Sequence, residues 1–351
     1  MSGGIDSSVA AIILQEKGYE VVGITMLAFD YSPVEYDKKY SVCCNDDTLN
    51  DVRSFAKKLG FEHHTIDIKD KFKKSIIDNF ISEYLSGHTP NPCALCNPLI
   101  RWRYLMEKAG EFNCDYVSTG HYARTDKYYD RYIIKTAKDS QKDQSYFLWG
   151  LSQEMIKNTI FPMGDFTKSE IKQMAKSKGF PDLSEKSESM EVCFIPDNDY
   201  RKFLKDNVAD LKNNVPEGNF VSTDGKILGT HKGFPFYTIG QRKGLEIAVG
   251  HPLYVNKIHP DTNTVVLGTK EELNRNEFFV EDTNFIKYET LPGEPEVKVR
   301  IRYNTAGVPG TIKTENGRIK VSLKKHVSAV APGQSAVFFE GEDILGGGII
   351  V

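Results

Sequence analysis

The chain has 351 residues, of which 40% are hydrophobic and 26% charged, and its formal net charge is −3. This length exceeds one typical domain and predicts two or three, and the composition is that of a soluble globular protein. No apolar run reaches the length of a membrane span and no signal-peptide pattern is present, which predicts a cytoplasmic protein without a membrane partner. The charge does not indicate a generally basic protein, so any RNA contact must come from local basic patches.

The first element is a turn rich in glycine and hydroxyl groups, Ser2-Gly3-Gly4-Ile5-Asp6-Ser7-Ser8, before the helical pattern of 9–14. Glycine lets the backbone approach a ligand, and free N–H groups at a helix N-terminus bind anions. We expect a pyrophosphate cradle in which Asp6 holds Mg²⁺ with help from Ser7. It is not a Walker loop, because no Gly-Lys-Ser/Thr follows. An ordinary serine-rich N-cap is the alternative.

The first half alternates strands, expected at 19–26, 63–68 and 116–120, with helices, expected at 47–59, 72–85, 99–109 and 167–179. This rhythm predicts an α/β fold with a doubly wound parallel sheet whose ligands lie beyond the carboxyl ends of the strands. A nucleotide loop normally follows a buried strand, and this sequence starts at the loop. We therefore expect that strand to be missing, which would leave unpaired backbone groups in the core.

The second half changes texture near residue 200, where short strands alternate with Gly and Pro, and it is nearly all β after 275. Alternating patterns at 297–303 and 318–323 favour a β-barrel that follows a small linking module. We predict a catalytic domain at 1–198, a central domain at 199–270 and a barrel domain at 271–351.

Cys93 and Cys96 have Cys-x-x-Cys spacing within Asn91-Pro92-Cys93-Ala94-Leu95-Cys96-Asn97-Pro98, which we interpret as a fixed loop before the helix at 99–109. A thiolate close to a helix N-terminus is stabilised, so a lowered pKa is expected for Cys96. Three interpretations remain open: a reactive thiol, half of a zinc or Fe–S site, and two buried cysteines without a role.

Cys193 lies in the apolar run 190–195, which predicts a short strand and, for Cys193 alone, a core cysteine. Whether Cys193 has a chemical role depends on whether its side chain lies close to that of Cys96. Cys43 and Cys44 are adjacent and are interpreted as structural or incidental. His121 follows a strand in Thr-Gly-His-Tyr, where a structural role and a nucleotide contact are equally favoured.

Together these segments resemble the tRNA-specific 2-thiouridylases, a family of PP-loop enzymes, over essentially the whole chain. The residues that carry the resemblance occur in the family's order and are the stretches 2–8, 89–97, 119–122, 142–147, 192–195, 238–245 and 331–337. The resemblance implies ATP-dependent thiolation of the wobble uridine in tRNAs for Lys, Glu and Gln. ATP would adenylate the uracil C2 oxygen and release pyrophosphate, and the base would leave the anticodon stack to react.

The resemblance also implies residue roles. Cys193 would receive sulfur as a persulfide from a donor protein, and Cys96 would resolve it and leave a Cys96–Cys193 disulfide. The nucleotide contacts would be Ser2, Gly3, Gly4, Asp6, Ser7, Ser8, Met26 and Gly120. The tRNA contacts would be Asn91, Pro92, Cys93, His121, Lys142, Asp143, Gln144, Arg302, Tyr303 and Gln334. The lysine-rich helix from Lys168 would contact the tRNA body or form a solvated face.

One departure from the family pattern is Cys93, where many members carry Asp. It adds a third thiol and leads to a second hypothesis, in which Cys93, Cys96 and Cys193 ligate a [4Fe–4S] cluster, as in related PP-loop thiolases. Two rival functions remain. One is another adenylating PP-loop enzyme, such as an amidotransferase-type synthetase, and the other is an RNA-binding protein with structural zinc at the cysteines.

Overall fold

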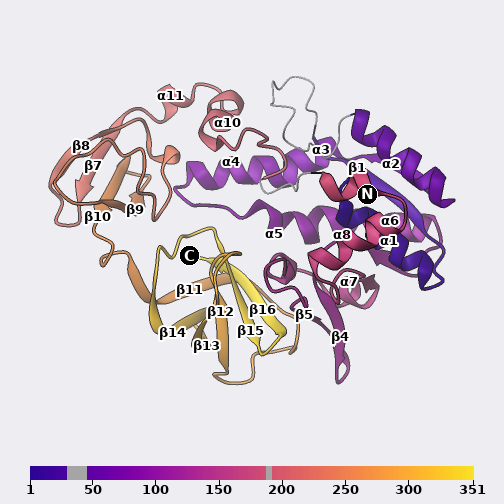
Figure 1. The fold of residues 1–351 in the computed structure, drawn as a ribbon. Coiled ribbons are helices and arrows are strands. Elements are labelled where there is room, and N and C mark those ends of the chain that lie inside the picture. Colours follow the sequence, from indigo (N-terminus) through magenta and orange to yellow (C-terminus); the bar gives the residue numbers. More distant parts are fainter. Residues whose placement is uncertain (30–45, 187–191) are drawn as a thin grey trace.

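The computed structural model describes residues 1–29, 46–186 and 192–351. Predictions for Cys43, Cys44 and the first part of the 190–195 run lie outside the described residues. Figure 1 shows three parts: an α/β part that contains the N-terminus, a small β module reached by α4, and a barrel that contains the C-terminus. Among the described residues, no helix combines the length and apolarity needed to cross a bilayer.

The α/β part contains two pairs of parallel strands. β1 (Val22–Leu27) pairs with β2 (Glu62–Asp67), and β3 (Val117–Ser118) pairs with β6 (Thr159–Ile160). The surrounding helices are α1 (Ile5–Glu16), α2 (Asp46–Leu59), α3 (Lys69–Phe72), α4 (Asp78–Leu85), α5 (Pro92–Cys96), α6 (Arg103–Glu111), α7 (Gln153–Lys157), α8 (Lys168–Ser177) and α9 (Pro181–Glu185). Shorter turns are the π-helical η1 (Lys73–Ile77) and η2 (Asn97–Trp102) and the 3₁₀ turn η3 (Ser145–Leu148).

In nucleotide-binding α/β folds a buried strand normally leads into the phosphate loop, and the sheet of this protein differs at that position. Among the described residues no strand joins β1 to β3, so the parallel sheet consists of two separate pairs. Met1 lies beside β1: its amino group donates to the Ile24 carbonyl, and Thr25 Oγ1 donates to the Met1 carbonyl at 2.8 Å. The chain therefore enters the loop from a position next to β1.

The small module carries a four-stranded mixed sheet in the order β8-β7-β10-β9. Its elements are α10 (Tyr200–Asn207), α11 (Leu211–Asn214), β7 (Gly218–Ser222), β8 (Ile227–His231), the 3₁₀ turn η4 (Phe234–Phe236), β9 (Tyr254–His259) and β10 (Thr264–Gly268). Aromatic residues of this module and of α4 share one hydrophobic cluster, which fixes the module to the α/β part. One example is the stacked pair Tyr84 and Tyr200, whose ring centroids are 4.6 Å apart.

The barrel closes because its first strand pairs with its last. Its strands are β11 (Asn274–Phe285), β12 (Glu296–Arg300), β13 (Val308–Glu315), β14 (Arg318–Ser328), β15 (Ser335–Glu340) and β16 (Asp343–Ile350). They run in the order β11-β14-β13-β12-β15-β16, with a further β11–β16 pairing that removes the exposed edges. Alternating side chains such as Val297, Val299, Ile319 and Val321 fill the interior.

A hairpin of the α/β part extends the barrel sheet. β4 (Arg124–Tyr128) and β5 (Arg131–Lys135) are antiparallel, and Lys135 of β5 pairs with Asp343 of β16. Arg131 also donates to the carbonyls of Phe285 and Ile286 at 3.0 and 2.9 Å. The barrel is therefore held directly against the α/β part (Figure 1).

The α/β fold, the linking module and the closed barrel confirm the predicted fold class, and the exact domain boundaries stay a prediction. Three local predictions were wrong. The helix expected from 99 begins at Pro92, and the strand expected at 297–303 ends at Arg300. Residues 192–195 form a turn closed by the Ile195 N–H to the Val192 carbonyl at 2.9 Å, not a strand.

Candidate functional site

The loop of Ser2 to Ser8, which we call the phosphate loop, contains the N-terminus of α1, and no side chain caps this terminus. Gly4 is the N-cap of α1, and no side chain accepts a hydrogen bond from the first turn there. Ser7 and Ser8 instead turn their hydroxyls back onto the Gly4 carbonyl at 3.3 and 3.0 Å. Gly3 has φ +73°, and a Cβ there would collide with Thr48. This arrangement leaves backbone N–H groups for an anion, which fits the expected pyrophosphate cradle.

Gly120 lies directly against this loop. A Cβ at Gly120 would be 2.7 Å from both the carbonyl carbon of Asp6 and the amide nitrogen of Ser7. Only glycine allows the turn after β3 to approach the loop backbone this closely. Met26, at the end of β1, is half-buried and packs against the large cluster of Phe72 and Phe194.

The substitution Gly120→Ala is expected to damage the loop. The added methyl group would push on loop backbone, so we expect the free energy of unfolding to fall by about 1–3 kcal/mol and the Kd for ATP to rise about tenfold or more. Gly110→Ala is the matched control, because a Cβ there meets nothing within 4 Å. Calorimetric ATP titration and thermal melts measure both effects, and an unchanged Kd in Gly120→Ala would contradict this view of the loop.

Asp6 pairs with a buried lysine. Lys168 Nζ lies 2.7 and 2.9 Å from the two Asp6 carboxylate oxygens, and the Tyr122 hydroxyl donates to Asp6 Oδ1 at 2.9 Å. Lys168 itself is only 8% exposed, while the expectation that the lysine-rich helix contacts the tRNA body or forms a solvated face stays a prediction. Lys172 and Lys176 of the same helix are exposed. The part-exposed Asp6 carboxylate has the chemistry of an Mg²⁺ ligand, since this ion is usually bound by one or two carboxylates and the substrate phosphates.

Cys93 and Cys96 lie in a helix and not in a loop. Asn91 caps α5 by accepting from the Ala94 N–H at 3.3 Å, and Pro92 occupies the first turn. The helix continues without a break through η2 into α6. Cys96 is the last residue of α5, so it does not lie at the N-terminus of this helix.

The surroundings of both thiols favour the protonated form. Burial by neighbouring protein raises the pKa of Cys93 and raises that of Cys96 to about 11, and the positive charge of Arg101 opposes this effect. The Cys93 side chain is still accessible to solvent, although protein surrounds its thiol on most sides, and Cys96 is half-buried. The expected lowering of the Cys96 pKa was wrong, because desolvation outweighs the charge of Arg101.

The raised pKa predicts slow alkylation of Cys96. With a pKa of about 11, the thiolate fraction rises about tenfold per pH unit throughout the range from pH 7 to 10. We expect the iodoacetamide rate at Cys96, followed by peptide mass spectrometry in a Cys93→Ser background, to rise across this range without a plateau. A plateau near pH 7 would instead indicate the stabilised thiolate that the sequence predicted.

Cys193 is exposed on the turn 192–195. Its neighbour Phe194 is buried edge-on against Phe72 and Phe80, at centroid distances of 5.8 and 5.2 Å. Cys96 packs against the same cluster. Cys93, Cys96 and Cys193 form no disulfide in the structure, so the Cys96–Cys193 bond is absent from it.

The described residues do not fit an iron–sulfur cluster. Across 1–29, 46–186 and 192–351, no group of three or more His, Cys, Asp or Glu side chains is arranged to hold a metal ion. The three cysteines of the cluster hypothesis all belong to these residues. The structure therefore does not bring them together as a ligand set.

His121 connects the phosphate loop to the helical segment that carries Cys93 and Cys96 (α5 and η2, residues 92–102), which we call the thiol helix. It follows Gly120, and its Nε2 lies 3.1 Å from Arg101 Nη1, while its Nδ1 lies 2.8 Å from Thr119 Oγ1. Because arginine only donates, Nε2 accepts and Nδ1–H donates. Burial, aided by the charge of Arg101, holds the His121 pKa well below its usual value, so the ring is neutral.

Several residues expected to contact tRNA are engaged inside the protein. Asp143 is 3% exposed, accepts from the N–H groups of Ala137 and Ser145, and pairs with Arg300 at 2.7 Å. Gln144 Oε1 accepts from the Tyr122 N–H at 3.0 Å.

The remaining expected tRNA contacts are more open. Gln334 Nε2 donates to the carbonyls of Thr89 and Pro90 at 2.8 and 3.1 Å, which ties the barrel to the start of the thiol helix. Tyr303 is half-buried and stacks on Phe147 at 4.6 Å. Arg302 is exposed, and Lys142 is half-buried.

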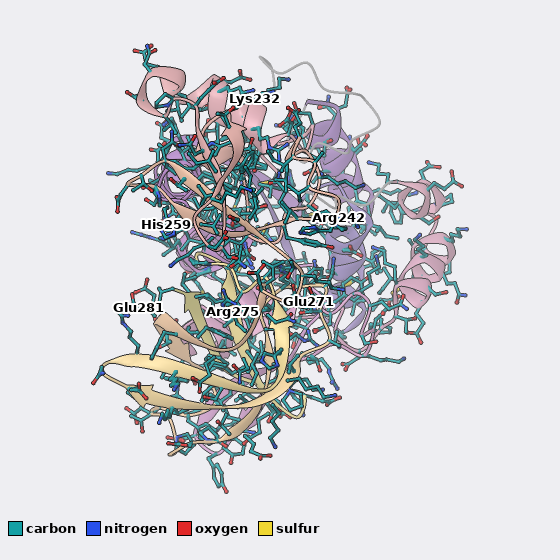
Figure 2. The ribbon with its side chains drawn as sticks, turned by 90° about the vertical axis from the view of Figure 1, so that its left-hand side faces the viewer. Lys232, Arg242, His259, Glu271, Arg275 and Glu281 are labelled. Carbon is teal, nitrogen blue, oxygen red and sulfur yellow. The ribbon has the colours of Figure 1, made fainter. Side chains whose placement is uncertain are left out.

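A cavity of about 770 Å³ lies where the three parts meet. Its wall combines Thr89 of the α/β part, residues 200–201 and 238–244 of the small module, and Arg302, Ala331 and Gln334 of the barrel. Four cations line it: Arg201, Arg242, Lys243 and Arg302. In Figure 2, Arg242 lies on the small module, and Glu271 and Arg275 mark the connection from that module to the barrel. The sequence analysis did not identify Arg201, Arg242 and Lys243 as site residues. Arg242 and Lys243 could have been found, because they form a short basic segment between two glycines.

Fold and site together define a nucleotide-binding α/β protein of the PP-loop class, with a glycine-rich anion loop, two nearby thiols and two β modules. Three family models match consecutive parts of the chain. They are the tRNA methyl transferase HUP domain at residues 1–197, the tRNA methyl transferase PRC-barrel domain at 201–269 and the aminomethyltransferase beta-barrel domain at 275–350.

Full-length relatives give the family. The tRNA-specific 2-thiouridylase MnmA of Amoebophilus asiaticus is 50% identical over 351 residues, which cover 100% of this chain and 93% of the relative. The enzyme of the same name in Cytophaga hutchinsonii is 48% identical over all of this chain and 95% of its own length, and that of Salinibacter ruber is 46% identical over all of this chain and 92% of its own length. The chain belongs to the tRNA-specific 2-thiouridylase family.

Proposed function

We propose that this chain is a cytoplasmic, ATP-dependent sulfurtransferase that converts the wobble uridine of tRNAs for Lys, Glu and Gln to 2-thiouridine. The observation that carries the proposal is the short segment 119–122, which contacts both halves of the site. Gly120 packs on the phosphate loop, and His121 bonds to Arg101, in the helical turn that follows Cys96. A nucleotide site joined in this way to a thiol helix suits an enzyme that first activates an oxygen and then replaces it with sulfur.

Adenylation would come first. The C2 oxygen of the uracil would attack the α-phosphorus of ATP, and the bond to the β-phosphate oxygen would break. Pyrophosphate would leave with that electron pair and would be held by the loop of Ser2 to Ser8. Asp6 would hold Mg²⁺ and Ser7 would assist it, the ion serving to neutralise phosphate charge, while Met26 and Gly120 would contact ATP.

Sulfur transfer would follow on the two cysteines. A persulfide donor would pass its outer sulfur to Cys193. That sulfur would attack C2 and form a C–S bond, and AMP would leave with the original oxygen. The Cys96 thiolate would then attack Cys193 Sγ and break the S–S bond, leaving the electron pair on the sulfur of 2-thiouracil. The resulting Cys96–Cys193 disulfide would need a dithiol reductant to restore both thiols.

The RNA would reach this site across the cavity of about 770 Å³ that lies where the three parts of the molecule meet. Its cations suit phosphate contacts, and the exposed Arg302 and the half-buried Tyr303 suit a phosphate contact and stacking. Asn91, Pro92, Cys93, His121, Lys142, Gln144 and Gln334 remain proposed tRNA contacts. Asp143 acts through its pairing with Arg300 and the placement of Gln144, not through a direct contact.

A reconstituted reaction tests the proposal. The components are the purified chain, an unmodified tRNA transcript, Mg-ATP, a persulfide donor and a dithiol. We expect one AMP and one pyrophosphate per 2-thiouridine formed. Formation of AMP without thiolated RNA, unchanged in Cys96→Ser and Cys193→Ser, would instead favour another adenylating PP-loop enzyme. RNA binding without ATP consumption, in a protein that contains zinc, would favour the RNA-binding alternative.

The persulfide route also predicts the metal content. Because the described residues supply no set of three cysteine ligands, we expect protein purified without oxygen to be colourless, free of iron and fully active. Elemental analysis and the visible spectrum measure this. A brown protein whose activity falls in proportion to lost iron would contradict the persulfide route and support the cluster hypothesis.

A further inference from the structure

Lys168 is a buried cation that the reaction described above does not use. It is 8% exposed, and its Nζ lies 2.7 and 2.9 Å from the Asp6 carboxylate oxygens and 5.7 Å from the centre of the Tyr122 ring. Asp6 lies in the first turn of α1, within the phosphate loop of Ser2 to Ser8. The ammonium group therefore lies at the mouth of the anion cradle, carried there by a residue 162 positions later in the chain.

The backbone of α8 fixes the start of this lysine side chain. Thr167 caps the helix, and a reciprocal capping box with Glu170 is complete. The Lys168 N–H also donates to Asp139 Oδ2 at 3.0 Å. Both contacts hold Lys168 at the first position of α8, so its side chain is aimed at Asp6 by a rigid helix end.

The ion pair is not needed to attach α8 to α1. Both helices contribute to one apolar cluster, in which Ile5, Val9 and Ile13 of α1 meet Ile171 and Ala175 of α8. Burial of the Lys168 ammonium group costs desolvation free energy, and apolar residues of similar size at such positions are often as stable. A buried ammonium group that the packing of α8 does not require, and that lies beside an anion-binding loop, favours a role in binding an anion.

We propose that Lys168 is the phosphate-binding lysine of this site and binds the β- and γ-phosphate oxygens of ATP and then the leaving pyrophosphate. This inference rests on the proposed function and deepens it. The loop of Ser2 to Ser8 carries three serines and one aspartate but no cationic side chain, so it offers an anion only backbone N–H groups and serine hydroxyls. Lys168 supplies the missing positive charge, and Asp6 serves as its counter-ion until Mg²⁺ and phosphate arrive. With both bound, Asp6 would hold the ion and the Lys168 ammonium group would contact the phosphate oxygens.

Pyrophosphate and AMP distinguish this role from a structural one. The full-length chain is titrated calorimetrically with Mg-pyrophosphate, Mg-ATP and AMP, as wild type and as Lys168→Met, Lys168→Arg and Lys172→Met. We expect Lys168→Met to weaken pyrophosphate and ATP binding at least tenfold while AMP binding changes less than twofold and the melting temperature is kept. Lys168→Arg keeps the charge and should recover part of the loss. The exposed Lys172 is the matched control and should behave as wild type.

Each other outcome overturns the proposal. Wild-type pyrophosphate affinity in Lys168→Met would remove the lysine from the phosphate site. Equal losses for AMP and pyrophosphate in Lys168→Met, or in Lys168→Arg where the Met variant does not fold, would leave only a structural ion pair. These binding data need no tRNA, so a wild-type protein that binds pyrophosphate through Lys168 but thiolates no tRNA would refute the proposed function alone.

Discussion

Cys96→Ser is expected to lower the thiolation rate by more than about 10³-fold, because removal of a nucleophile abolishes the step that depends on it. Adenylation needs the phosphate loop and not this thiol, so AMP formation should continue in the absence of thiolation. Ser is close to Cys in size, and Cys96 is the last residue of a helix capped by Asn91, so the fold should persist. Affinity for tRNA should therefore stay within about twofold of wild type, a change of less than about 0.5 kcal/mol.

A filter-binding or gel-shift titration of tRNA, together with mass spectrometry of the RNA product, separates the two effects. Cys114→Ser is the matched control, since Cys114 is a free thiol outside the site, and it should thiolate normally. Loss of tRNA binding in Cys96→Ser would show that the thiol helix serves architecture and not sulfur chemistry.

Asp143→Ala is expected to produce the largest loss of stability. The Asp143 side chain is 2% exposed and pairs with Arg300 at 2.7 Å across the contact between the α/β part and the barrel. Removal of one partner leaves a largely buried guanidinium without its counter-charge, which costs about 3–5 kcal/mol. Two backbone N–H groups, those of Ala137 and Ser145, lose their acceptor as well.

Chemical denaturation followed by fluorescence measures this loss. Asp126→Ala is the control, because the Asp126–Lys135 pair is 3.4 Å long and its carboxylate is 56% exposed. Surface pairs contribute about 0–1 kcal/mol, so its midpoint should hardly move. A stable Asp143→Ala protein with weakened tRNA binding would contradict this prediction and would support the direct RNA contact that the sequence predicted for Asp143.

The local elements of this fold could be predicted because their signals are local. Gly3 and Gly4 indicate a loop whose backbone can approach an anion. The strand and helix patterns for β1, α2 and β2 predict bounds within a few residues of the observed ones. The barrel followed from strict alternation in β12 and β14. Each of these signals lies within a few residues of the feature that it predicts.

The thiol helix was misjudged for a physical reason. Prolines at 92 and 98 suggested a loop, since proline breaks an α-helix interior. In the structure Pro92 begins the helix, and Pro98 lies in the wider π-helical turn η2. Asn97 fixes this turn by donating to the Phe147 carbonyl at 2.9 Å, a partner that no local pattern reveals.

Long-range pairing explains the other errors. Asp143 was expected to contact tRNA because its partner Arg300 follows 157 residues later, and the pairing of Lys168 with Asp6, which precedes it by 162 residues, has no local signal either. The turn at 192–195 looked like a strand because a short apolar run gives no period. Its Phe194 is buried by aromatic rings of α3, α4 and α10, which the sequence keeps far apart.

The central claim is that this chain places sulfur on the wobble uridine through Cys96 and Cys193. Mass spectrometry of position 34 in tRNA from a bacterial strain that lacks its own 2-thiouridylase, complemented with this chain, tests it most directly. We predict that the wild-type chain restores 2-thiouridine and that neither the Cys96→Ser nor the Cys193→Ser variant does. Unmodified uridine with the wild-type chain expressed and folded, or full thiolation with both serine variants, would contradict the account.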